Sequence, residues 1–115
     1  MESTTEPAVP YIAVLLYVSS SDAADYPPLY SEDVVLLYAR SPAHAEEKAQ
    51  RLGEDRRTTY RNDRGESITW RLLRVADVAP ALDDRLTEDA ELYSRHFTDL
   101  AAYERFDTSA ADRPA

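Results

Sequence analysis

TTYRNDRGESITWRLLRVADV, residues 58–78, carries the strongest secondary-structure signal in the chain. Two segments with alternating apolar residues flank the turn sequence NDRG, Asn62–Gly65, a pattern typical of a β-hairpin. In the second segment Ile68, Trp70 and Leu72 fall on one face, because side chains alternate along a strand with a period of two. We predict hairpin strands at 58–61 and 66–75 that pack one face and leave the other in water.

Three segments before the hairpin have equally clear signals. Tyr11–Val18 is almost uniformly apolar and rich in β-branched and aromatic residues, as expected of a central strand covered on both faces. Val34–Ala39 predicts a second strand of similar character. Ser41 can cap a helix that Pro42 begins and Gly53 ends. Along that helix three residues recur at helical spacing and predict a narrow stripe against the sheet: Ala45, Ala49 and Leu52.

The remaining segments complete the predicted fold. Ser19–Ser31 is a long loop, and Leu92–Phe97 is expected to be the last strand. The three-residue spacing of Leu100, Tyr103 and Phe106 suits either a short helix or an irregular packed end. We therefore predict an α+β fold with a mostly antiparallel five-stranded sheet and one main helix on one face. The predicted order is strand, strand, helix, strand, strand, strand.

The length and composition fit one small acidic domain. A chain of 115 residues has room for a single core, over residues 11–106, with flexible tails at 1–10 and 107–115. The net charge of −9 opposes nonspecific binding to nucleic acid or anionic lipid and favours cationic partners. No cysteine is present, so thiolate catalysis and cysteine-based metal sites are excluded.

The composition also indicates where the protein works. Ile12–Val18 is too short to cross a bilayer, and the residues before it include Glu2 and Glu6 but none of the basic residues of a signal peptide. Of the thirteen Lys and Arg residues only one is lysine, and alanine is abundant, as in bacteria with GC-rich genomes. We expect a soluble, cytoplasmic bacterial protein with no membrane contact.

Several short motifs follow one another along the chain in an order and spacing that match a known protein family. They are YIAVLLY at 11–17, Glu32 with VVL at 34–36, the alanine-rich helix at 41–53, YRN at 60–62 with Gly65-Glu66 and Trp70, VADV at 75–78, and ELYSR at 91–95. In this arrangement the chain resembles a bacterial family of small proteins, domain of unknown function 4288. The resemblance spans roughly residues 11–97. It implies a stand-alone bacterial α+β protein and transfers no catalytic residue.

No set of residues demands a reaction. The two histidines, His44 and His96, lie on different predicted elements and lack a zinc-ligand spacing, so we expect neither a metal site nor a cofactor. No serine has the glycine neighbours of a nucleophile elbow. The acidic pairs Asp83-Asp84 and Glu88-Asp89 fit a solvated linker better than a calcium loop, which needs spaced acids and a central glycine. The sequence leans away from an enzyme and identifies no catalytic residue.

Tyrosine content points instead to recognition. Eight tyrosines are a high number for this length, and a rigid ring with a polar tip binds at a low entropic cost. Tyr26 and Tyr30 flank Pro27-Pro28 in the long loop, where they either contact a protein partner or pin the loop to the sheet. The leading hypothesis is a small acidic, non-enzymatic binding or regulatory module that acts through protein–protein contacts, including self-association as a homodimer.

The alternative hypothesis is a binding protein, or a small enzyme, for an anionic metabolite. A concave sheet face would hold the ligand through Trp70, Arg71, Tyr93, Arg95 and His96. Arginines near the hairpin either clamp such an anion or pair with the domain's own acids: Arg56, Arg57, Arg61, Arg64, Arg71 and Arg74. Basic residues between aromatic ones also occur on nucleic-acid platforms, but the net charge of −9 disfavours that partner.

Overall fold

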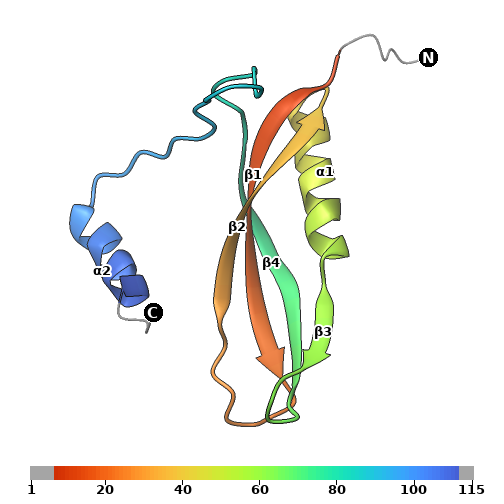
Figure 1. The fold of residues 1–115 in the computed structure, drawn as a ribbon, viewed down its shortest axis with the longest axis vertical. Coiled ribbons are helices and arrows are strands. Elements are labelled where there is room, and N and C mark those ends of the chain that lie inside the picture. Colours follow the sequence, from red (N-terminus) through yellow and green to blue (C-terminus); the bar gives the residue numbers. More distant parts are fainter. Residues whose placement is uncertain (1–6, 112–115) are drawn as a thin grey trace.

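The fold is one antiparallel sheet with a helix on one face and a second helix held away from the sheet (Figure 1). The computed structural model describes residues 7–111, and the side chains of residues 7–106. The four strands lie in the order β2-β1-β4-β3, and each neighbouring pair is antiparallel. In chain order the elements are β1 (Val9–Ser21), β2 (Tyr30–Ala39), α1 (Pro42–Asp55), β3 (Thr58–Arg61), β4 (Ser67–Pro80) and α2 (Leu100–Ala111).

The prediction of a five-stranded sheet was wrong. Leu92–Phe97, expected to be the fifth strand, is irregular, and the described residues form four strands. The segment is attached through side chains: the Tyr93 hydroxyl donates to Asp77, and Arg95 donates to Glu32. Among the described residues no backbone hydrogen bond joins this segment to a strand, so it is not part of the ladder.

β1 is the centre of the sheet, as its continuous apolar sequence predicts. It pairs with β2 on one side and with β4 on the other. Nearly all of its residues from both faces are buried, including Tyr11, Ile12, Ala13, Val14, Leu15, Tyr17 and Val18. Alternate positions of a strand point to opposite faces, so burial at successive positions requires cover on both sides.

The predicted hairpin of β3 and β4 is confirmed, with β4 longer than expected. Asn62 holds the turn, because its Oδ1 accepts from the backbone nitrogens of Arg64 (3.0 Å) and Glu66 (2.9 Å). Gly65 has a φ of 77°, which glycine adopts without steric cost. Ile68 is only 2% exposed, so the predicted packed face of the hairpin is real.

α1 lies on the sheet through its predicted alanine stripe. Ser41 caps the helix, with its Oγ accepting from the backbone nitrogen of His44 at 3.1 Å. Ala45 and Ala49 are fully buried and belong to the same core cluster as the odd-numbered residues of β1. Their small side chains let the helix backbone approach the strands closely.

Gly53 does not end α1, as the sequence suggested, because the helix continues to Asp55. The glycine packs against β4 instead. A Cβ at this position would lie 2.9 Å from Cδ2 of Leu72 on β4. An added methyl group would therefore have to displace the end of the Leu72 side chain.

Residues 81–111, here called the C-terminal arm, leave the sheet after β4. Two backbone hydrogen bonds close the first loop of the arm: Leu82 N to Leu92 O at 3.3 Å and Asp83 N to Glu91 O at 3.0 Å. The arm ends in α2, so the helix is the right one of the two alternatives for this segment, and it extends beyond residue 106. Among the described residues α2 packs against no other helix or strand (Figure 1).

The structure describes only part of the two segments that were predicted to be flexible tails. Val9 and Pro10 already belong to β1, and residues 107–111 continue α2. The rest of the two tails, residues 1–6 and 112–115, lies outside the described residues. Within the described range, no helix combines the length and apolar character needed to cross a membrane.

Candidate functional site

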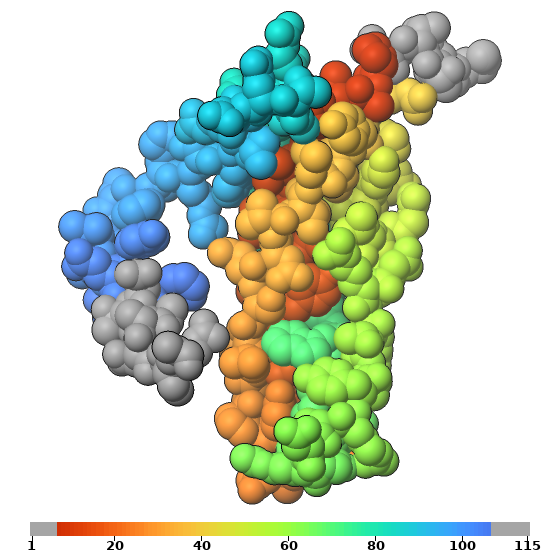
Figure 2. Space-filling model, in the orientation of Figure 1, coloured from red at the N-terminus to blue at the C-terminus, as the bar shows by residue number. Residues whose placement is uncertain are grey.

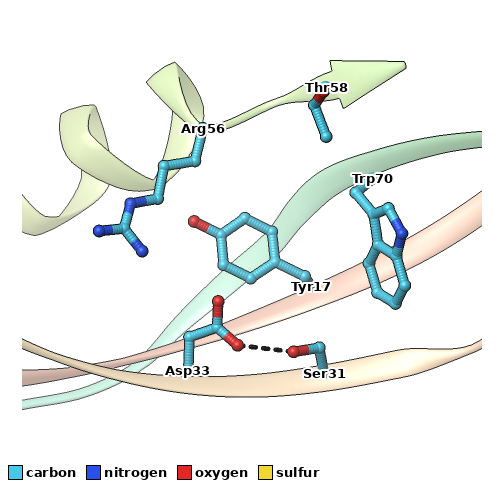
Figure 3. Close-up of a pocket in the computed structure, with 6 residues that line it drawn as sticks. All are labelled: Tyr17, Ser31, Asp33, Arg56, Thr58 and Trp70. Carbon is cyan, nitrogen blue, oxygen red and sulfur yellow. Dashed lines mark hydrogen bonds between the residues drawn. The ribbon is translucent and has the colours of Figure 1, made fainter. Parts of the chain in front are cut away.

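The first candidate site is a pocket of about 260 Å³ where α1 ends (Figure 3). We call it the helix-end pocket. Two aromatic and four polar side chains line it: Tyr17, Trp70, Ser31, Asp33, Arg56 and Thr58. These residues come from all four strands and from the position that follows α1. The pocket therefore forms only when the whole domain has folded.

The two charged groups of the helix-end pocket are not paired with each other. Ser31 Oγ donates to Asp33 Oδ1 at 2.6 Å and orients the carboxylate (Figure 3). The guanidinium of Arg56 makes no ion pair or hydrogen bond with the residues that the structure describes. A cation and an anion thus line one cavity, and each keeps hydrogen-bonding capacity for a ligand.

The Tyr17 side chain is one of the two aromatic walls of the helix-end pocket. Its side chain is buried, and its hydroxyl donates to the carbonyl oxygen of Gly53 at 3.3 Å. Burial raises the pKa of Tyr17, while nearby Arg56 lowers it and Asp33 raises it. Figure 3 places the guanidinium and the carboxylate near the hydroxyl end of the ring, with Trp70 on the other side. Tyr17 is therefore neutral at physiological pH and presents an aromatic wall to the cavity.

The second candidate site is the face of β2 that points away from α1. Side chains of β2 alternate between covered and open positions, and four large residues on the open side are exposed: Tyr30, Val34, Leu36 and Tyr38. We call these four residues the open row. β2 is also an edge strand, because in the described sheet it pairs with β1 alone. Val34, Leu36 and Tyr38 adjoin one another on this side, while exposed Glu32 separates them from Tyr30. Exposed apolar patches of this kind mark interaction surfaces.

The C-terminal arm crosses this open face and passes the outer edge of β2. Tyr93 donates to Asp77 on β4, and Arg95 pairs with Glu32 on β2 at 3.5 Å. By the strand register, Asp77 and Glu32 both point away from α1. The hydrogen bond to Asp77 raises the pKa of Tyr93, since the phenolate could no longer donate. These two anchors carry α2 beyond β2 (Figure 1).

A groove of about 810 Å³ separates α2 from β2 (Figure 2). Glu32 lines its β2 side, while Phe97, Tyr103 and Phe106 line its arm side. The Phe97 and Tyr103 rings stack with their centroids 4.9 Å apart. All three aromatic side chains are more than half exposed. An apolar helix face and an apolar strand row are therefore both uncovered next to the same groove.

The structure separates Tyr26 from Tyr30. The Tyr26 hydroxyl is hydrogen-bonded to Oγ of buried Ser19 at 2.8 Å, so this ring pins the loop to the sheet. Tyr30 begins β2 and is 60% exposed in the open row. Of the two readings left open by the sequence, the pinned loop describes Tyr26, and for exposed Tyr30 contact with a partner stays a prediction.

The five residues predicted to hold an anion do not meet at one place. Trp70 lines the helix-end pocket, whereas exposed Arg71, its neighbour in the strand, points to the opposite face. Tyr93 and Arg95 anchor the arm, and His96 lines the groove beside α2. Trp70 therefore lies in one cavity, Arg95 and His96 share another, and Arg71 and Tyr93 line neither.

Sequence reasoning missed Ser31 and Asp33 as site residues. Both were assigned to segments outside the strand predicted at Val34–Ala39, but β2 begins at Tyr30. The available signal was their spacing. Ser31, Asp33 and Val35 are two residues apart, so in a strand all three side chains point to the same, inward face. Polar residues on an inward row require a hydrogen-bonding partner or a cavity.

The part of the chain that the structure describes contains no group of three or more His, Asp or Glu side chains able to hold a metal ion. Neither candidate site therefore has a set of metal ligands. The two sites present hydrogen-bonding groups, charged groups and apolar surface to a ligand or partner.

Comparison with protein families shows which family this chain matches. The family model "Domain of unknown function (DUF4288)" matches residues 10–94. The matched segment takes in nearly all of the sheet, the whole of α1 and the arm anchor Tyr93, and it ends before α2. No curated protein and no solved structure matches the chain.

Proposed function

The chain belongs to the family of domain of unknown function DUF4288, and we propose that it is a non-enzymatic interaction module that binds through the open row and outer edge of β2. The observation that carries the proposal is that this apolar row and the apolar face of α2 are both uncovered in a single chain. On the composition described above, we place the module in the cytoplasm of a bacterium.

The edge of β2 supports the need for a partner. Its second half, VVLLYA at 34–39, has high β-propensity and contains no charge, proline or glycine. Natural proteins cover or pair such an edge, since an exposed one templates aggregation. Lys48 Nζ donates to the carbonyl oxygen of Tyr38 at 2.6 Å, which protects one end of the segment. The remainder needs a strand beside it.

The partner that fits is a second copy of the same chain. If β2 pairs antiparallel with β2 of another copy, a two-fold axis normal to the sheet keeps both open rows on the same side. α2 already lies on that side, beyond the β2 edge (Figure 1). In the pair, Tyr103 and Phe106 of each copy cover the partner's open row. One arrangement thus satisfies the free edge, the open row and the uncovered helix.

The shape of the single chain supports the same arrangement. The radius of gyration is 17.6 Å, whereas a compact domain of 100 residues has a value of about 13 Å. The long strands of the sheet and the arm, which holds α2 away from its own sheet, both contribute to this value. At that distance the apolar face of α2 buries little surface in a monomer. It becomes buried when a second molecule occupies the groove.

Charge is compatible with pairing at this edge despite the total of −9. Residues 34–39 are uncharged, and the nearby carboxylate of Glu32 is paired with Arg95. Like charges therefore lie mainly outside the proposed contact. Self-repulsion should weaken the dimer at low salt without preventing it.

The mass of the full chain in solution tests the proposal. Light scattering after gel filtration should give twice the monomer mass of 13.0 kDa. Val34→Lys places a charge in the open row and should give a monomer with an unchanged fold by circular dichroism. The matched control is Tyr60→Lys, because Tyr60 is similarly exposed but lies on β3 at the opposite edge of the sheet. This variant should remain dimeric.

Two results would overturn the proposed dimer. A wild type that stays at 13.0 kDa up to high concentration would remove the second copy as the occupant of the groove. A dimer that survives Val34→Lys and is lost in Tyr60→Lys would move the contact to the β3 edge.

A further inference from the structure

We infer that the helix-end pocket is a binding site for a free α-amino acid with an apolar side chain. The site is separate from the open row, since Trp70 and Tyr17 face the α1 side of the sheet. Its features are a pair of separated opposite charges, two aromatic walls and a small volume, and each of them restricts the ligand.

The charges select a zwitterion. Arg56 and Asp33 line the same cavity, yet they form no ion pair among the described residues. Opposite charges that face one space without touching leave room for a ligand with both a carboxylate and an ammonium group. The guanidinium offers paired donors that match a carboxylate, and the Asp33 carboxylate accepts from an ammonium group.

The Asp33 end of the pocket is held in place for that role. Ser31 donates to Oδ1 at 2.6 Å, which leaves Oδ2 and the outer lone pair of Oδ1 free to accept. Both residues lie on β2, opposite Tyr17 and Leu15 of the central strand in the ladder. A carboxylate fixed by a strand and by a neighbouring hydroxyl loses little entropy when a ligand binds.

The aromatic walls and the volume select the rest of the ligand. Tyr17 and Trp70 supply apolar surface next to the charged groups. The volume of about 260 Å³ lies just below the range of about 300 to 1,000 Å³ that holds drug-sized molecules. This volume matches one amino acid with an aliphatic or aromatic side chain better than a nucleotide or a longer peptide.

Trp70 gives a direct readout of binding, because it is the only tryptophan in the chain and it lines the pocket. We would titrate the full-length protein with L-leucine and L-phenylalanine and follow Trp70 emission and the melting temperature. Saturable changes in both are expected, since a ligand that binds only the native state stabilises it. The N-acetyl and the amide derivatives of the same amino acids lack one charge each and should bind at least about tenfold more weakly.

Variants then test whether Arg56 and Asp33 bind the two charged groups of the amino acid. Arg56→Gln and Asp33→Asn should each weaken binding at least about tenfold, because each loses a charge-assisted hydrogen bond. Arg57→Gln is the matched control, since this neighbouring arginine does not line the pocket and should leave affinity unchanged. The inference is wrong if neither amino acid changes Trp70 emission or melting. It is also wrong if the derivatives bind as tightly as the parent amino acids and if Arg56→Gln and Asp33→Asn bind these amino acids as tightly as wild type does. These outcomes do not depend on the mass of the protein and leave the proposed dimer untouched.

Discussion

The hydroxyl of Tyr17 lies 3.3 Å from the carbonyl oxygen of Gly53, which joins the central strand to the last turns of α1. The same glycine has Leu72 of β4 against its Cα side, where a Cβ would lie at 2.9 Å from Cδ2. One residue of the helix therefore meets two strands. The helix-end pocket opens beside this junction, so its geometry depends on how closely α1 approaches the sheet.

Gly53→Ala should destabilise the domain by about 1 kcal/mol, because overpacking costs about 1 to 3 kcal/mol and the gain in helix propensity offsets about 1. The measurement is urea unfolding of the variant and wild type. In a Leu72→Ala background the clash disappears, so the same Gly53→Ala change should stabilise by about 0.5 to 1 kcal/mol. A glycine substitution with the same effect in both backgrounds would contradict the proposed contact.

Stability at alkaline pH should report on Tyr17. Its folded pKa lies above the ordinary value of 10, so the neutral hydroxyl stabilises the fold below pH 10. That contribution is lost as the pH rises through the folded pKa. The free energy of unfolding of wild type and Tyr17→Phe should therefore differ most at neutral pH and converge above pH 10. Exposed Tyr60→Phe is the control. A constant difference between Tyr17→Phe and wild type across this range would refute the effect.

The loop before β2 should depend on Ser19 more than on either loop tyrosine. Ser19 Oγ accepts from Leu29 N at 2.9 Å and is bonded to Tyr26 at 2.8 Å, and Ser19 is only 1% exposed. Ser19→Ala leaves the Leu29 nitrogen unsatisfied and should cost about 1 to 3 kcal/mol in urea unfolding. Tyr26→Phe should cost about 1 kcal/mol, and exposed Tyr30→Phe almost nothing. A cost for Tyr30→Phe equal to that for Tyr26→Phe would show that the loop is held differently.

Added salt should strengthen the proposed dimer. Each copy carries a net charge of −9, while the contact at residues 34–39 is uncharged, so screening removes repulsion and leaves apolar contact intact. Analytical ultracentrifugation should give a dissociation constant that falls from low salt to about 0.5 M salt, where the Debye length is only a few ångströms. A constant that rises with salt would point to an interface held by ion pairs instead.

Local patterns predicted β1, α1 and the hairpin correctly, because in each of them neighbouring residues contain the decisive information. Asn62–Gly65 forms its turn from its own side chains, and Ala45 and Ala49 mark a helix face by spacing alone. Leu92–Phe97 was wrongly predicted to be a strand for a physical reason. An extended segment that crosses a sheet face has the same local pattern as one that pairs at an edge, and only its side-chain contacts with Asp77 and Glu32 distinguish the two.

The candidate sites were harder to predict from the sequence than the fold was. The role of Gly53 depends on Leu72, which lies in another element, and a helix-ending glycine has the same local signature. The helix-end pocket needed the true start of β2, because only then do Ser31 and Asp33 face Tyr17. The open row was hidden for a similar reason, since an apolar strand sequence does not tell which of its faces a helix covers.

Cysteine crosslinking tests the exchange of α2 between copies most directly, because the chain contains no cysteine of its own. Leu36→Cys, in the open row, and Tyr103→Cys, on α2, would be made as two separate proteins, mixed and oxidised. The covalent product would be read on a non-reducing gel, with Leu36→Cys plus Leu82→Cys as the control for random collisions. The proposed dimer predicts a mixed covalent dimer from the first pair well above the control. No mixed dimer, together with closure of the Leu36→Cys/Tyr103→Cys double variant within one chain, would show that α2 folds onto its own sheet.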